Sequence, residues 1–205
     1  MAELIRKLDL APAHLVGASY GAFITLYCAS KNPELAKTMV LGEPSIFPFL
    51  ARSHLKDDVE LLQGFRTRVE RPTQDASKRG DFRKAVQTFM DGVQGMENFF
   101  DQLPEEGKQA LMDNAKTLES DLESMLSASF TIEDVKQITT IPTLLVKGEL
   151  SPKFFLRIAD IISDNMSNTE EILIPNVSHD LGLMSGPDNN NVFNSKVMQF
   201  FARHG

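Results

Sequence analysis

A serine between two glycines constrains this chain more than any other feature of its sequence. The segment reads Gly17-Ala18-Ser19-Tyr20-Gly21. A short apolar run at 14–16 precedes it, and an apolar stretch with helical character follows at 22–30. We expect glycine at both positions to permit a sharp turn, because a Cβ there would crowd the neighbouring strand or helix. The sequence therefore predicts a strand, a tight turn and a helix, with the Ser19 hydroxyl exposed at the carboxyl end of the strand.

Three further apolar runs are typical of short buried strands, at 38–41, 143–146 and 172–174. Helical segments are predicted at 2–9, 22–30, 154–166 and 193–203. Short continuous apolar strands separated by helices are what a parallel sheet covered on both faces requires. We therefore predict an α/β fold.

The middle of the chain differs in character from both ends. Between Phe47 and Ile138 no strand run occurs and charge density rises. Helical spacing recurs there in Phe82-Ala85-Val86-Phe89-Met90 and in Ala110-Leu111-Asn114-Leu118. We interpret 47–138 as a helical lid inserted into a core formed by 1–46 and 139–205.

Composition excludes several classes of protein. The 205 residues suffice for one core and a lid, and 42% hydrophobic with 24% charged residues is typical of a soluble globular chain. The net charge of −7 argues against nucleic-acid binding, which needs clustered Lys and Arg. No apolar run reaches the roughly 18 residues of a membrane span, and the N-terminus lacks the apolar stretch of a signal peptide. We therefore expect a cytoplasmic protein without membrane contact.

The residues from 14 to 41 resemble the serine-elbow region of the α/β-hydrolase superfamily, and 141–201 resemble its C-terminal part. Within that superfamily the chain looks most like bacterial lid-bearing hydrolases of the esterase, enol-lactonase and haloperoxidase-like group. The resemblance implies an α/β-hydrolase-like parallel sheet with helices on both faces. It also implies a Ser, acid, His triad in that chain order, acting on a small acyl substrate without a metal or organic cofactor.

Three members of the expected site follow from position. Ser19 is the predicted nucleophile. His179 follows the last predicted strand and precedes the terminal helix, which matches the position of the catalytic histidine in the superfamily. The backbone N–H of Tyr20 lies at a helix N-terminus, where it could stabilise an oxyanion.

The acid of the triad is open between two glutamates. The superfamily's usual aspartate would follow strand 143–146 in a Gly-x-x-Asp pattern, whereas this chain reads Gly148-Glu149-Leu150-Ser151. Ser151 cannot hold an imidazolium by charge, so the acid is Glu149 or a carboxylate at another strand end. Glu43 follows strand 38–41, where some members carry their acid. We favour Glu43, because Pro44 would hold it rigidly.

Complete members of the superfamily have several strands before the elbow, and an early loop supplies a second oxyanion donor. Few residues precede Leu15, so we expect a sheet truncated at the N-terminus. Losing one such donor costs about 2.7–4 kcal/mol of transition-state stabilisation. The chain is then either a serine hydrolase, or a weak or inert truncated hydrolase that serves as a binding module or needs a partner chain. The unpaired sheet edge would also allow a homo-oligomer.

Overall fold

The fold is built on four parallel strands. The computed structural model describes the backbone of residues 1–184 and 187–204, and the side chains of 1–184 and 192–204. The strands are β1 Ala13–Ala18, β2 Ala36–Gly42, β3 Thr143–Gly148 and β4 Thr169–Ile174. They lie side by side in the order β1-β2-β3-β4, so β1 and β4 are the edges of the sheet within the described residues.

The register brings the ends of neighbouring strands to within two residues of one another. Ala18 of β1 pairs with Gly42 of β2, and Gly148 of β3 pairs with Ile174 of β4. Because all four strands run in the same direction, the residues that follow them gather along one side of the sheet. We call this side the carboxyl edge.

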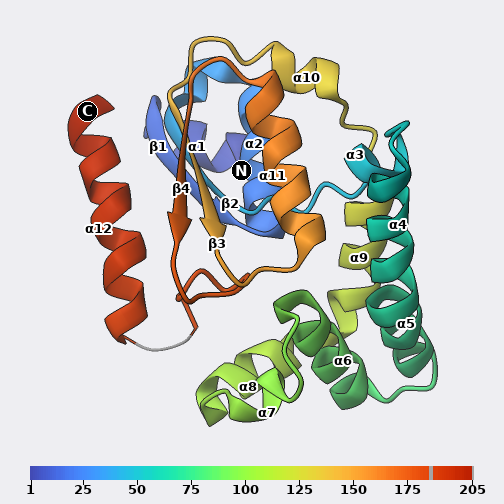
Figure 1. Cartoon of the computed structure of the whole chain (residues 1–205). Coiled ribbons are helices and arrows are strands. Elements are labelled where there is room, and N and C mark those ends of the chain that lie inside the picture. The colour runs from blue at the N-terminus through green and yellow to red at the C-terminus, as the bar shows by residue number, and fades with distance from the viewer. Residues whose placement is uncertain (185–186, 205) are drawn as a thin grey trace.

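Helices cover both faces of the sheet, as the apolar runs predict. Helices α2 (Tyr20–Lys31) and α11 (Lys153–Asn165) pack on one face, and α12 (Pro187–His204) on the other (Figure 1). Met39 and Leu41 of β2 belong to the apolar cluster that contains α2 and α11, whereas Val40 belongs to the cluster that contains α12. All three side chains are fully buried, which explains why the run is apolar without alternation.

Between β2 and β3 the described chain forms helices and no strands. They are α3 Pro48–Ala51, α4 Lys56–Phe65, the π-helical turn η2 Arg66–Glu70, α5 Arg71–Lys78, α6 Phe82–Gln94, α7 Phe99–Gln102, α8 Glu105–Asp113, the 3₁₀ turn η3 Ala115–Thr117, α9 Leu118–Ser127 and α10 Ile132–Lys136. Figure 1 shows α6, α7 and α8 beyond the carboxyl edge. The remaining elements are α1 Ala2–Lys7 and the 3₁₀ turn η1 Pro33–Leu35.

One helical pattern of the insertion is broken in the structure. The spacing at 110–118 predicts helix throughout, but α8 ends at Asp113 and α9 begins only at Leu118. The Asn114 side chain donates a hydrogen bond to the Ala110 carbonyl at 2.9 Å, which satisfies a terminal carbonyl of α8. Asparagine favours helix ends for this reason, and apolar spacing alone does not reveal it.

Within residues 1–184 and 187–204, we find no helix that is long and apolar enough to cross a membrane.

Acid is expected to weaken the attachment of α10 to α2, because Asp134 joins the two helices. Its carboxylate accepts hydrogen bonds from Lys31 Nζ at 2.8 Å and from the Thr131 N–H at 2.9 Å. The bond from Lys31, and next those from Thr131, lower the pKa of Asp134 to about 2. Since the unfolded value is about 3.9, the stabilisation is complete above about pH 4 and is lost as the pH falls through about 2.

Half of the Lys31 side chain is exposed, so we expect the pair to contribute about 1 kcal/mol. The measurement is the free energy of unfolding of the wild type and of Asp134→Asn at about pH 7 and about pH 2.5. The difference in free energy of unfolding between the wild type and Asp134→Asn should be smaller at about pH 2.5 than at about pH 7. A gap that is independent of pH would contradict this account.

Candidate active site

Ser19 stands in the turn between β1 and α2 with a strained backbone. Its φ of 53° and ψ of −120° lie in a region that L-residues rarely adopt. Its N–H donates to the Gly42 carbonyl at 2.7 Å, and its own carbonyl accepts from the Ser45 N–H at 3.3 Å. The segment after β2 therefore holds the strained residue from both sides, and the turn lies at the carboxyl edge, as the sequence predicts.

The two glycines that flank Ser19 are not equivalent. A Cβ at Gly17 would lie 2.4 Å from the Gly21 carbonyl oxygen and 2.7 Å from the Ala22 nitrogen. A Cβ at Gly21 would meet nothing within 4 Å. The expectation of crowding is thus confirmed for Gly17 and wrong for Gly21, because position 21 faces open space in the first turn of α2.

Gly17→Ala is therefore expected to lower the free energy of unfolding by about 2–3 kcal/mol, since the added methyl group meets backbone atoms that only a shift of α2 could move. The matched variant Gly21→Ala should be neutral, or should stabilise by up to about 1 kcal/mol through its higher helix propensity. Urea denaturation of both variants measures the difference. Equal midpoints for the two variants would contradict this packing of α2 against β1.

Ser19, His179 and Glu43 form a continuous chain of hydrogen bonds. His179 Nε2 lies 2.9 Å from Ser19 Oγ, and His179 Nδ1 lies 2.7 Å from Glu43 Oε2. The other carboxylate oxygen, Glu43 Oε1, accepts from the Gly148 N–H at 2.7 Å. The Phe155 ring stacks on the imidazole at 3.5 Å between centroids, which fixes the plane of the ring. Glu43 is fully buried and His179 is 6% exposed, so these two side chains are shielded from water, whereas Ser19 is only partly buried.

Of the two candidate acids, the structure brings Glu43 to the histidine and not Glu149. Glu43 takes a positive φ of 43° directly after β2, which turns its side chain inward. Glu149 is exposed, and its Oε2 accepts from the Asn176 N–H at 2.9 Å in the loop after β4. Ser151, at the position of the usual aspartate, is buried, and its hydroxyl has no hydrogen-bond partner within the described residues.

Tyr20 is the first residue of α2. The first N–H groups of a helix have no partner within the helix, and the helix dipole makes this end positive. The N–H of Tyr20, the residue that follows Ser19, therefore has no partner within α2 and is free to donate a hydrogen bond. The arrangement can receive negative charge that develops beside Ser19.

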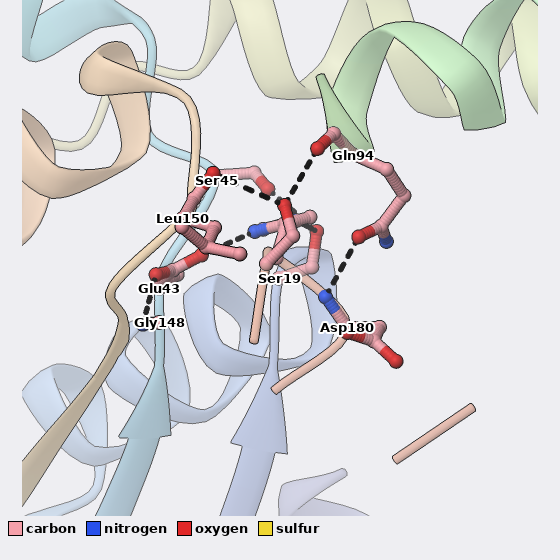
Figure 2. A network of polar contacts seen from close by, with 9 residues as sticks. Ser19, Glu43, Ser45, Gln94, Gly148, Leu150 and Asp180 are labelled. Carbon is pink, nitrogen blue, oxygen red and sulfur yellow. Dashed lines mark hydrogen bonds and ion pairs between the residues drawn. The ribbon is translucent and has the colours of Figure 1, made fainter. Parts of the chain in front are cut away.

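Two further residues touch this site without having been predicted from the sequence. The Ser45 hydroxyl lies 2.8 Å from Ser19 Oγ (Figure 2). Gln94, at the end of α6, accepts from Ser178 Oγ at 2.6 Å with its backbone carbonyl and from the Asp180 N–H at 3.1 Å with its side chain. Position just after a strand end could have indicated Ser45. No pattern could have indicated Gln94, because it belongs to an ordinary amphipathic helix.

A cavity of about 430 Å³ adjoins the loop that carries His179. The insertion contributes one wall and the loops after β3 and β4 contribute the other, and its apolar lining is Met96, Phe99, Leu103, Leu150, Val177 and Met184. Asp180 and Gln102 add polar atoms. A mostly apolar cavity with a few polar groups is typical of a small-molecule site.

Comparison with known proteins identifies the fold. The family described as alpha/beta hydrolase fold matches residues 1–183. A bromoperoxidase from Bacillus anthracis is 18% identical, with a TM-score of 0.68 over 98% of this chain and 71% of its own. An esterase from Exiguobacterium antarcticum is 17% identical, with a TM-score of 0.67 over 97% and 70%. MGS-M2, an alpha/beta hydrolase enzyme from a deep-sea metagenome library of the Medee basin, is 22% identical, with a TM-score of 0.64 over 98% and 69%.

None of the curated proteins compared with the chain matches it. At the identities of the solved structures, the likeness is one of fold.

Proposed function

Since this chain belongs to the alpha/beta hydrolase fold family, we propose that it is a serine hydrolase of a small ester, lactone or related acyl substrate. The observation that carries the proposal is the hydrogen-bonded chain from Ser19 through His179 to Glu43. A carboxylic ester is the favoured substrate class, because some of the similar structures are esterases. Nucleophile, base and orienting acid within hydrogen-bond reach of one another are the signature of covalent acyl transfer.

The first half of the reaction forms an acyl-enzyme. Ser19 Oγ attacks the substrate carbonyl carbon while its proton passes to His179 Nε2. Glu43 accepts from Nδ1–H throughout and stabilises the imidazolium without taking the proton. The carbonyl oxygen gains the negative charge and accepts a hydrogen bond from the Tyr20 N–H. When the carbonyl re-forms, the bond to the leaving alcohol breaks, and the alkoxide takes the proton from Nε2.

The second half repeats these steps with water. His179 Nε2 removes a proton from a water molecule that attacks the acyl carbon, and the proton then returns to Ser19 Oγ as the ester bond to the enzyme breaks. The products are the carboxylic acid and the free serine. These steps use no metal or organic cofactor.

The helical insertion serves as the lid in this proposal. Phe99 and Leu103 line the cavity beside the His179 loop from the insertion, and Leu150 and Val177 line it from the core loops. Ser19 and His179 do not line this cavity, so in the proposal it receives the part of the substrate that lies away from the reacting carbonyl, and its apolar walls favour an apolar group there.

A fluorophosphonate probe tests the proposal directly, because it phosphonylates an activated serine. We expect the folded wild type to be labelled, with the adduct mapped by mass spectrometry to the peptide that contains Ser19. Ser178, which is buried beside the site and bonded to Gln94, should remain unmodified. Absence of labelling in protein that is folded by circular dichroism would overturn the proposal and would favour the inert binding module instead.

A further inference from the structure

A second hydroxyl group lies against the proposed nucleophile. Ser45 follows β2 by three residues and is 1% exposed. Its Oγ lies 2.8 Å from Ser19 Oγ, and its backbone N–H donates to the Ser19 carbonyl. Within the described residues, the Ser45 hydroxyl has no hydrogen-bond partner other than Ser19. A buried hydroxyl is therefore held against the one atom that is expected to react.

The direction of this hydrogen bond follows from counting protons. In the proposed mechanism Glu43 is ionised and only accepts, and a neutral His179 carries its proton on Nδ1, so that its Nε2 is an acceptor. Ser19 donates its single proton to Nε2. The proton between the two serines must then come from Ser45, which makes Ser45 the donor to Ser19 Oγ.

That donor is well placed for the charge that develops during attack. The negative charge forms on the carbonyl oxygen, which is attached to the same carbon as Ser19 Oγ and is therefore only two bonds from it. A serine hydroxyl turns freely about its Cβ–Oγ bond. The Ser45 proton can thus turn from Ser19 Oγ, which is a weak acceptor once it is bonded to the carbonyl carbon, to the oxygen that carries the negative charge.

We propose that Ser45 is a catalytic residue that donates a hydrogen bond to the oxyanion of the tetrahedral intermediate, together with the Tyr20 N–H. This inference rests on the proposed serine hydrolase function and adds a side-chain donor to it. It places a side-chain donor beside the backbone donor of Tyr20. No covalent bond to Ser45 forms or breaks.

Ser45→Ala tests the inference, and Ser151→Ala is its matched control. Both serines are buried and follow strands at the carboxyl edge, but the Ser151 hydroxyl has no partner within the described residues. With p-nitrophenyl acetate as the substrate, Ser45→Ala should lower kcat by about 10²–10³-fold, with little change in KM. Ser19 adds to the carbonyl carbon of a trifluoromethyl ketone and forms a stable oxyanion. The affinity of Ser45→Ala for this ketone should therefore fall together with kcat. Ser151→Ala should change neither quantity.

The outcomes separate this inference from the function on which it rests. If the wild type neither hydrolyses the ester nor reacts with fluorophosphonate, the proposed serine hydrolase function itself is overturned. An active wild type whose Ser45→Ala variant keeps its kcat, or loses kcat without losing affinity for the ketone, overturns the role of Ser45 alone. Should the alanine variant fail to fold, Ser45→Cys keeps a group of similar size with a weaker donor, and the same two measurements apply.

Discussion

Replacing Ser19 with alanine is expected to lower kcat for ester hydrolysis by about 10⁶-fold. Alanine has a Cβ, as serine does, so we expect the backbone of the turn to keep its conformation. The variant has no oxygen that could attack the carbonyl carbon. His179 and the Tyr20 N–H remain, so a residual rate about 10³–10⁴-fold above the uncatalysed reaction should persist from binding and oxyanion stabilisation. Initial rates with p-nitrophenyl acetate at high enzyme concentration measure the loss.

Stability provides the control for Ser19→Ala. The protein should still fold, because the backbone bonds of residue 19 to Gly42 and Ser45 do not involve the hydroxyl. Its free energy of unfolding should fall by about 1–3 kcal/mol, because the buried Ser45 hydroxyl loses its partner. A folded Ser19→Ala protein that hydrolyses the ester at the wild-type rate would show that the reaction proceeds through another group.

Replacing Glu43 with glutamine is expected to lower kcat by about 10⁴-fold. The Gly148 N–H donates to one oxygen of this side chain, so the glutamine oxygen stays on Gly148 and the NH₂ group faces His179. His179 Nδ1 must then accept, which places the ring proton on Nε2. In that tautomer Nε2 cannot take the proton from Ser19, although every heavy atom is in place.

Glu149→Gln is the matched control, because it makes the same change in the other candidate acid. Glu149 is exposed and bonds to a backbone amide, so its replacement should leave kcat within about threefold of the wild type. If the Glu149 variant loses more activity than the Glu43 variant, the acid has been assigned to the wrong strand end.

The sheet could be predicted from the sequence because its strands are buried on both faces. The run 38–41 is apolar at every position except Thr38, since Met39 and Leu41 meet one helical layer and Val40 meets the other. The breaks in the insertion could not be predicted, because they depend on local side-chain bonds such as that of Asn114 to Ala110.

The candidate site was predictable where chemistry is tied to a strand end. Ser19 and His179 each follow a strand, and parallel strands bring such residues to one edge. Only the structure separates Glu43 from Glu149, because both follow strands but the Glu43 carboxylate is buried beside His179 while Glu149 is exposed. Gln94 reaches the histidine loop from α6, which is a tertiary contact without a local sequence pattern.

Gln94 forms hydrogen bonds with Ser178 and Asp180, the residues on either side of His179. The two halves of the site are therefore held in place by different parts of the chain. Ser19 and Glu43 are tied together through the turn and strand end that share backbone bonds, so the folded sheet alone sets their spacing. The insertion contacts His179 indirectly, through the hydrogen bonds of Gln94 to Ser178 and Asp180. If α6 moves and these two bonds break, the bond of His179 to Glu43 and its stacking on Phe155 still hold the imidazole from the core. The imidazole is thus supported from both sides, and Gln94 acts on it only through the residues on either side of it in the sequence.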